Sequence, residues 1–94
     1  MRPFRDLIHP LEAQDRERGS DLIRTLSVYF AANANISEAA DRLFLHRNSL
    51  RYRLKRAGEL TGLNLNDDRV RLALQLGLLA IREERSTDDE DKHP

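Results

Sequence analysis

Apolar residues recur along most of the chain at the three- and four-residue intervals of amphipathic helices, and no segment sustains the two-residue alternation of a strand. The first such pattern covers residues 4–11 and the second covers residues 22–30. Pro10 interrupts the first pattern, so we expect a break or a fresh helix start near it. Ser20 precedes the second pattern and is its expected N-cap. The two patterns predict two helices at the start of the chain.

Three further helices are predicted in the rest of the chain. A short helix begins with Ser37 as its N-cap, and a longer one runs from about 47 to 61. Gly62 follows the longer helix as a natural left-handed terminator. Asn66 is the expected N-cap of a last helix that runs to about Glu84. The pattern therefore predicts an all-α, five-helix domain.

The third and fourth predicted helices have the spacing of a helix-turn-helix. Such a motif needs a small residue where its two helices touch, and Ala40 suits that position. Phe44 stands where many such turns place a glycine for its positive φ. The motif is assigned to residues 36–57. The apolar residues that would fix the crossing of the two helices follow Ala40 at set intervals and are Leu43, Leu45, Leu50 and Leu54.

The chain divides into three parts on this pattern. Residues 1–19 form an N-terminal helical segment, and residues 20–85 form the helix-turn-helix domain. Residues 86–94 are an acidic, polar tail that we expect to be disordered. The residues expected to build the core are Leu22, Leu26, Phe30, Ala40, Leu43, Leu45, Leu50, Leu54, Leu74 and Leu78.

Charge is distributed unevenly, although 16 basic and 16 acidic residues give a formal net charge of zero. Residues 42–56 hold six arginine or lysine residues and no acidic one. On the helix predicted over 47–61, Leu50, Leu54 and Ala57 share one face. The opposite face is then polar and basic, which is typical of a helix that enters the DNA major groove. A solvated arginine-rich face is the alternative interpretation, and the helix-turn-helix context favours nucleic acid.

The candidate DNA-binding residues divide by the contact that each can make. The N-terminal residues of the second helix of such a motif usually reach base edges. The expected base contacts are Arg47, Asn48 and Tyr52, with His46 as a further candidate. Two of these have structural alternatives, because Tyr52 could cover neighbouring side chains and His46 could be an unusual N-cap. The expected phosphate contacts are Ser49, Arg51, Arg53, Lys55 and Arg56.

Composition disfavours several other classes of protein. The chain has no cysteine, so it has neither a disulfide nor a thiolate metal site, and its three histidines are scattered. No catalytic set or phosphate loop occurs in a recognisable order, so we expect no enzyme activity and no cofactor. An apolar run of membrane-spanning length and a secretory signal are both absent from the sequence. We therefore expect a cytoplasmic protein.

Residues 22–80 resemble the C-terminal helix-turn-helix domain of the PucR/CdaR family of bacterial transcriptional regulators. The most specific part is the run HRNSLRYRL, in which Ser49 stands where the family more often has threonine. The resemblance implies a DNA-binding domain that ends a longer regulator with an N-terminal ligand-sensing region. The second helix of the motif is also similar to that of Fis-type DNA-binding domains. The pieces that carry the resemblance are Thr25–Phe30, Asn35–Leu43, Leu45–Leu54, Glu59–Asp67 and Arg71–Ala80.

The last predicted helix is apolar on all sides, which indicates burial against more than one neighbour. One interpretation places it at the centre of the domain, between the first two helices. The other is a homodimer, or docking on the N-terminal region that the resemblance implies. Ala73, Gly77 and Ala80 would then form a flat strip where another helix could approach. We expect a homodimer, since two recognition helices about 34 Å apart read successive major grooves.

Double-stranded DNA is the expected partner. The alternative function is a protein-interaction or dimerisation module that acts through the apolar residues 70–81 without direct DNA binding. Salt separates the two, because binding through about five or six phosphates falls steeply with salt, whereas apolar burial is weakly salt-sensitive. The acidic tail could also lower DNA affinity by competing for the basic face.

Overall fold

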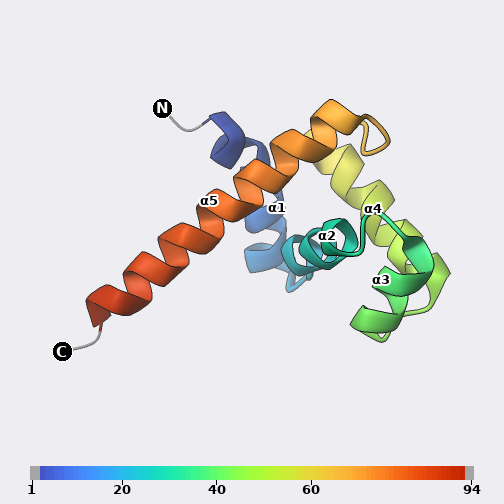
Figure 1. Ribbon diagram of the computed structural model, residues 1–94, viewed down its shortest axis with the longest axis horizontal. Helices are drawn as coiled ribbons and strands as arrows, with labels where there is room; N and C mark the ends of the chain where they lie inside the picture. Colours follow the sequence, from blue (N-terminus) through green and yellow to red (C-terminus); the bar gives the residue numbers. More distant parts are fainter. Residues whose placement is uncertain (1–2, 93–94) are drawn as a thin grey trace.

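Five helices make up the described part of the chain, which contains no strand (Figure 1). The computed structural model describes residues 3–92, and the side chains of residues 4–84. The all-α, five-helix prediction is confirmed, and the fourth helix has the bounds expected from the sequence. The helices are α1 (Pro3–Arg18), α2 (Leu22–Ala31), α3 (Ile36–Leu43), α4 (Arg47–Thr61) and α5 (Asp68–Lys92).

α1 is one continuous helix, so the break expected at Pro10 is wrong. A proline inside a helix removes a backbone hydrogen bond and crowds the preceding turn. Ile8 and Leu11, on either side of the proline, are fully buried, and α1 packs on α5, α2 and α4. Burial of such side chains contributes about 1.5–3 kcal/mol each, which offsets the cost of the proline. α1 therefore belongs to the same core as the helix-turn-helix.

The start of α2 is capped from α1. The carboxylate of Asp15 accepts the backbone N–H groups of Leu22 at 2.8 Å and Ile23 at 3.0 Å. The hydroxyl of Ser20 donates to the same carboxylate at 2.6 Å, and the N-cap position belongs to Asp21. The prediction that Ser20 caps this helix is therefore wrong. A side chain from a neighbouring helix satisfies the free N–H groups, and it also fixes α1 against α2.

The starts of α3 and α5 also differ from the prediction. Asn35 is the N-cap of α3, and its side chain accepts from the N–H of Glu38 at 2.9 Å, so Ser37 lies inside the helix. The side chain of Asp67 accepts from the N–H of Arg69 at 2.8 Å, so Asp67 caps α5 and the prediction of Asn66 is wrong by one residue. Several polar residues occur together at each start, and each of them is a good N-cap, so the local pattern does not choose between them.

All five helices contribute buried residues to one core, in which α1 and α2 contact α4 and α5, and α3 packs on α2 and α4. Seven of the ten predicted core residues are buried, and Phe30, Leu45 and Leu78 are half-buried against them. The buried hydrophobic residues outside that list of ten are Ile8, Leu11, Tyr29, Ala32, Ala39, Ala57 and Ile81.

α5 packs on α1 and α2 (Figure 1). Gly77 lies at the crossing with α1. A Cβ atom built there would stand 2.3 Å from the carbonyl oxygen of Phe4 and 2.6 Å from Cγ1 of Ile8. Part of the predicted small-residue strip is therefore occupied by α1 and is not open to a second chain. The first two helices both pack on α5, as the central-helix interpretation expects, but Leu72, Leu76 and Leu79 are exposed, so α5 is not enclosed on all sides.

Arg5 adds a polar link between α1 and α5. Its Nε donates to both carboxylate oxygens of Glu84 at 3.1 Å, and its Nη1 donates to Glu12 at 2.7 Å. The hydrogen bonds to Glu84 and then Glu12 raise the pKa of Arg5 above its ordinary value. The first turns of α1 are thereby held against α5 near Glu84.

α5 continues as a helix to Lys92, beyond the end expected near Glu84. The prediction of a disordered tail over 86–94 is therefore corrected for residues 86–92, while 93–94 lie outside the described residues. Adding residues to an existing helix is favourable once its first turns are held by packing. Figure 1 shows that α5 leads this segment away from α4. The competition hypothesis requires the acidic tail to lie over the basic face of α4. Residues 86–92 do not lie there.

Candidate nucleic-acid interface

α3 and α4 form the predicted helix-turn-helix, joined by Phe44, Leu45 and His46. Phe44 has φ 55° and ψ 40°, the left-handed conformation expected at this position. The N–H of Phe44 donates to Asp41 at 3.2 Å, and the N–H of Leu45 donates to Ala40 at 2.9 Å. These two bonds close a Schellman motif at the end of α3, with phenylalanine in the position that glycine usually takes. The turn sets the start of α4 against α3.

The inner face of α4 anchors the helix in the core. Leu50, Leu54 and Ala57 are buried, as their spacing predicts. The opposite face is open to solvent, and Tyr52 is 69% exposed. A side chain this exposed covers little of its surroundings, so it is available for a partner. The other exposed site residues on α4 are Arg47, Asn48, Ser49, Arg51 and Lys55.

His46 caps α4. Its Nδ1 accepts the backbone N–H of Asn48 at 3.0 Å, so the N-cap interpretation of this residue is confirmed. A neutral imidazole that accepts at Nδ1 carries its proton on Nε2. His46 is exposed, and Nε2–H remains a donor at the N-terminal end of α4. Capping and a contact with DNA are therefore compatible in this residue.

Arg53 differs from the other basic residues of α4 because it is half-buried and bonded within the domain. Its Nη1 donates to Oγ1 of Thr25 at 3.2 Å. Thr25 is buried, and its hydroxyl donates to the carbonyl of Asp21 at 2.6 Å. The chain of bonds links α4 to the first turn of α2. Arg53 thus helps to fix the angle at which the basic helix stands on the core.

Few of the basic side chains on α4 are neutralised within the domain. Arg56 lies 3.8 Å from Glu59, and Arg51 donates to Oδ1 of Asn48 at 3.4 Å. Among the described residues, the side chains of Arg47 and Lys55 have no carboxylate partner. Arg47, Arg51 and Lys55 therefore form a positive surface without a facing acid on the exposed side of α4.

A groove of about 670 Å³ borders α4 on the side of the turn between α1 and α2. Gln14 and Ser20 line one wall, while Ser49, Tyr52 and Arg53 line the other. Sequence reasoning missed Gln14 and Ser20 as neighbours of the basic helix. They come from a distant part of the chain, and no local motif links them to α4. Residues outside the motif therefore border the surface that would meet DNA.

A buried inner face, a left-handed turn and an exposed basic outer face define a helix-turn-helix domain of the class found in transcriptional regulators. The model of the PucR C-terminal helix-turn-helix domain matches residues 22–80. The chain belongs to the PucR family. The match begins at the first residue of α2 and ends within α5, so α1 lies outside it.

Several curated regulators are similar to the chain. The proline-responsive transcriptional activator PutR of Bacillus subtilis is 39% identical over 72 residues, which cover 77% of the chain and 18% of PutR. The purine catabolism regulatory protein of the same organism is 41% identical over 66 residues, 70% of the chain and 12% of that protein. The carbohydrate diacid regulator of Escherichia coli is 48% identical over 59 residues, 61% of the chain and 15% of that protein.

The chain thus spans less than a fifth of the length of each of these three relatives. No solved structure gives a significant match. In the described part of the chain, no helix is long and apolar enough to cross a membrane. Over the same residues, no group of three or more His, Asp or Glu side chains is arranged to hold a metal ion.

Proposed function

We propose that the chain binds double-stranded DNA sequence-specifically, with α4 in the major groove. The observation that carries this proposal is the exposed, basic outer face of α4 opposite its buried leucines. Arg47, Asn48 and Tyr52 lie in the first turns of α4, from which base edges are usually read, and His46 precedes them. Arginine pairs with guanine and asparagine with adenine by two hydrogen bonds each, so these residues supply selectivity.

The phosphate contacts come from the flanks of the same helix. Ser49, Arg51, Lys55 and Arg56 are the proposed donors, because they carry hydroxyl, guanidinium or ammonium groups beside the outer face. Arg53 has a mixed role, since its bond to Thr25 already holds α4 in place. We expect its guanidinium to orient the helix as well as to face the DNA backbone.

The proposal extends to a second copy of the chain. A homodimer would place two α4 helices on successive major grooves about 34 Å apart, and would favour a DNA site with two-fold symmetry.

The proposal also extends to the rest of the regulator and to its location. The greater length of the relatives supports an N-terminal sensing region in the full regulator. A bacterial protein that binds chromosomal DNA works in the cytoplasm, and we infer that it acts by binding and not by catalysis.

The experiment that tests the proposal selects a preferred duplex from random sequences and compares it with a scrambled one. Arg47→Ala and Asn48→Ala should lose most of the preference, because each paired contact contributes about 1–3 kcal/mol of discrimination, or 5- to 150-fold. Arg82→Ala is the matched control, as it removes an exposed arginine from α5. If Arg47→Ala and Asn48→Ala prefer the selected duplex as strongly as Arg82→Ala does, base reading by α4 is contradicted.

Direct protein binding is the second candidate function, favoured by exposed leucines on α5. An affinity for a protein partner that survives high salt, without any DNA binding at low salt, would establish this alternative.

A further inference from the structure

A stripe of exposed side chains runs along α5 on the side that faces away from the core. Its three leucines, Leu72, Leu76 and Leu79, are 60%, 37% and 51% exposed, although leucine is ordinarily buried. Leu74 and Ile81, on the opposite side of the helix, are buried. The described residues thus leave an apolar face of α5 largely uncovered. The complete stripe consists of Arg69, Leu72, Leu76, Leu79 and Glu83.

The spacing of this stripe is that of a helix that packs lengthwise on a second helix. Its five residues follow one another at intervals of three, four, three and four. Single exposed leucines need no explanation, but three in this register indicate a helical partner. The stripe begins with Arg69 and ends with Glu83. Neither side chain has a partner among the described residues.

We propose that the stripe joins two copies of the chain as an antiparallel pair of α5 helices. Arg69 and Glu83 are equally far from Leu76 along the chain. Antiparallel pairing about Leu76 therefore sets Arg69 of each copy opposite Glu83 of the other. A parallel pair would set like charges against each other at both ends, which is unfavourable. Charge thus selects a second copy as the occupant, and it selects the two-fold, antiparallel orientation.

Side-chain size fits the same register. In an antiparallel pair centred on Leu76, Leu72 of one copy lies opposite Ala80 of the other, and Leu79 lies opposite Ala73. Ala73 and Ala80 are half-buried on the edge of the stripe nearer α1. Large residues then meet small ones at both positions, which permits close interdigitation of the two helices.

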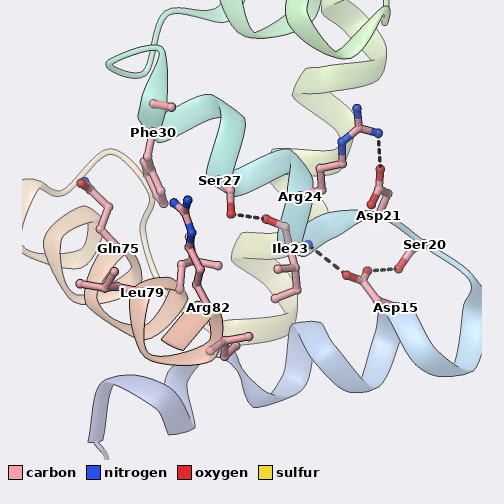
Figure 2. A pocket seen from close by; sticks show the side chains of 13 residues that line it. Asp15, Ser20, Asp21, Ile23, Arg24, Ser27, Phe30, Gln75, Leu79 and Arg82 are labelled. Carbon is pink, nitrogen blue, oxygen red and sulfur yellow. Dashed lines mark hydrogen bonds and ion pairs between the residues drawn. The ribbon is translucent and has the colours of Figure 1, made fainter. Parts of the chain in front are cut away.

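A groove between α2 and α5 extends this surface on the other edge of the stripe (Figure 2). Leu79 belongs to both the stripe and the groove. Figure 2 shows Gln75 and Arg82 of α5 beside Phe30 of α2, so polar side chains border the apolar lining. An apolar centre with a polar rim is the usual anatomy of a protein interface.

The pairing rests on the proposed function for its purpose, because it joins two DNA-binding domains. The stripe belongs to α5 and the basic face to α4, so both basic helices stay exposed in the pair. Three leucines per copy make a small contact, and interfaces below about 1,000 Å² are transient. The pair is therefore a weak, concentration-dependent dimer that a two-fold DNA site strengthens.

Cysteine cross-linking tests the interface directly, because the natural chain has no cysteine. Leu76→Cys places its sulfur near the two-fold axis, opposite the same cysteine of the second copy. A disulfide with a Cα separation of about 6 Å can form there. Leu72→Cys is the matched control, because it faces position 80 of the second copy. The cysteine of that copy then lies about 12 Å further along the helix, at 1.5 Å per residue. The double variant Arg69→Cys/Glu83→Cys should also link two chains, since these positions are about 21 Å apart within one helix.

After mild oxidation, Leu76→Cys and the double variant should run mainly as linked dimers, while Leu72→Cys stays monomeric. Equal linking of Leu72→Cys and Leu76→Cys would show a parallel pair and overturn the proposal. An unlinked Leu76→Cys chain with wild-type circular dichroism would overturn it as well. DNA binding by the wild-type chain is measured separately, so failure of the interface and failure of the DNA-binding function are told apart.

Discussion

At the residue scale, Phe44 combines two unfavourable features in the turn of the motif. Its backbone is left-handed, with φ 55°, and its side chain is 93% exposed. The left-handed conformation costs a residue with a Cβ atom about 1–2 kcal/mol. The spacing of the motif predicted this conformation, because the end of a helix and the start of the next fix the turn. The exposure of the ring had no signal in the sequence.

Phe44→Gly should raise the free energy of unfolding by about 1 kcal/mol relative to Phe44→Ala. Glycine removes the strain, whereas alanine keeps the Cβ atom and therefore the strain, and both remove the exposed ring. Urea unfolding of the two variants measures the difference. Equal stabilities would show that the turn stores no strain.

Arg53 is the residue whose role depends most on tertiary structure. It lies in the same basic run as Arg47, but only Arg53 meets the buried hydroxyl of Thr25. The two partners are 28 residues apart, so no local pattern indicates the bond. The capping of α2 by Asp15 escaped prediction for the same reason.

Arg53→Ala should lower the free energy of unfolding by about 1 kcal/mol, the usual contribution of an intramolecular hydrogen bond. Arg47→Ala serves as the control and should stay within about 0.5 kcal/mol of the wild type, because an exposed side chain without a partner contributes little. Chemical denaturation of both variants makes the comparison. If Arg53→Ala is as stable as Arg47→Ala, the role of Arg53 in positioning α4 is contradicted.

At the element scale, the crossing of α1 and α5 holds the domain together. The sequence predicted both helices, and it predicted α4 from end to end because Gly62 marks its end locally. It did not predict the burial of Ile8 and Leu11, since Pro10 between them indicated a break. Local patterns define where helices start and stop more reliably than they define which helices touch.

Gly77→Ala should disrupt this crossing and lower the free energy of unfolding by about 1–3 kcal/mol, the usual cost of overpacking. The added Cβ atom would stand 2.3 Å from a backbone oxygen of Phe4, so α1 must shift. Thermal unfolding followed by circular dichroism measures the loss. A higher melting temperature, from the better helix propensity of alanine, would mean that α1 does not approach α5 this closely.

At the scale of the whole molecule, opposite charges are distributed over different helices. The net charge of zero is the sum of a basic α4 and an acidic end of the chain, which α5 carries away from α4 (Figure 1). The sequence predicted the basic helix and an apolar last helix, but not which side of α5 the other helices leave exposed. That side depends on how α1 and α2 pack, which follows from the complete fold.

Charge reversal tests the pairing of two molecules. Arg69→Glu should weaken self-association, because it sets two glutamates together at each end of the antiparallel pair. The double reversal Arg69→Glu/Glu83→Arg should restore it, since opposite charges face each other again. Sedimentation equilibrium at low salt measures both variants. Weak association of the double variant, at the level of Arg69→Glu, would contradict the antiparallel register.

The central claim is that α4 binds DNA through its basic face, and the salt dependence of DNA affinity tests it most directly. For the wild-type chain on a duplex, log affinity should fall linearly with log salt, and Lys55→Ala should reduce the slope by about 1. Arg82→Ala, which removes a positive charge from α5, should keep the wild-type slope. No measurable binding at about 50 mM salt, or equal slopes in all three proteins, would contradict the assignment of α4 to the DNA backbone.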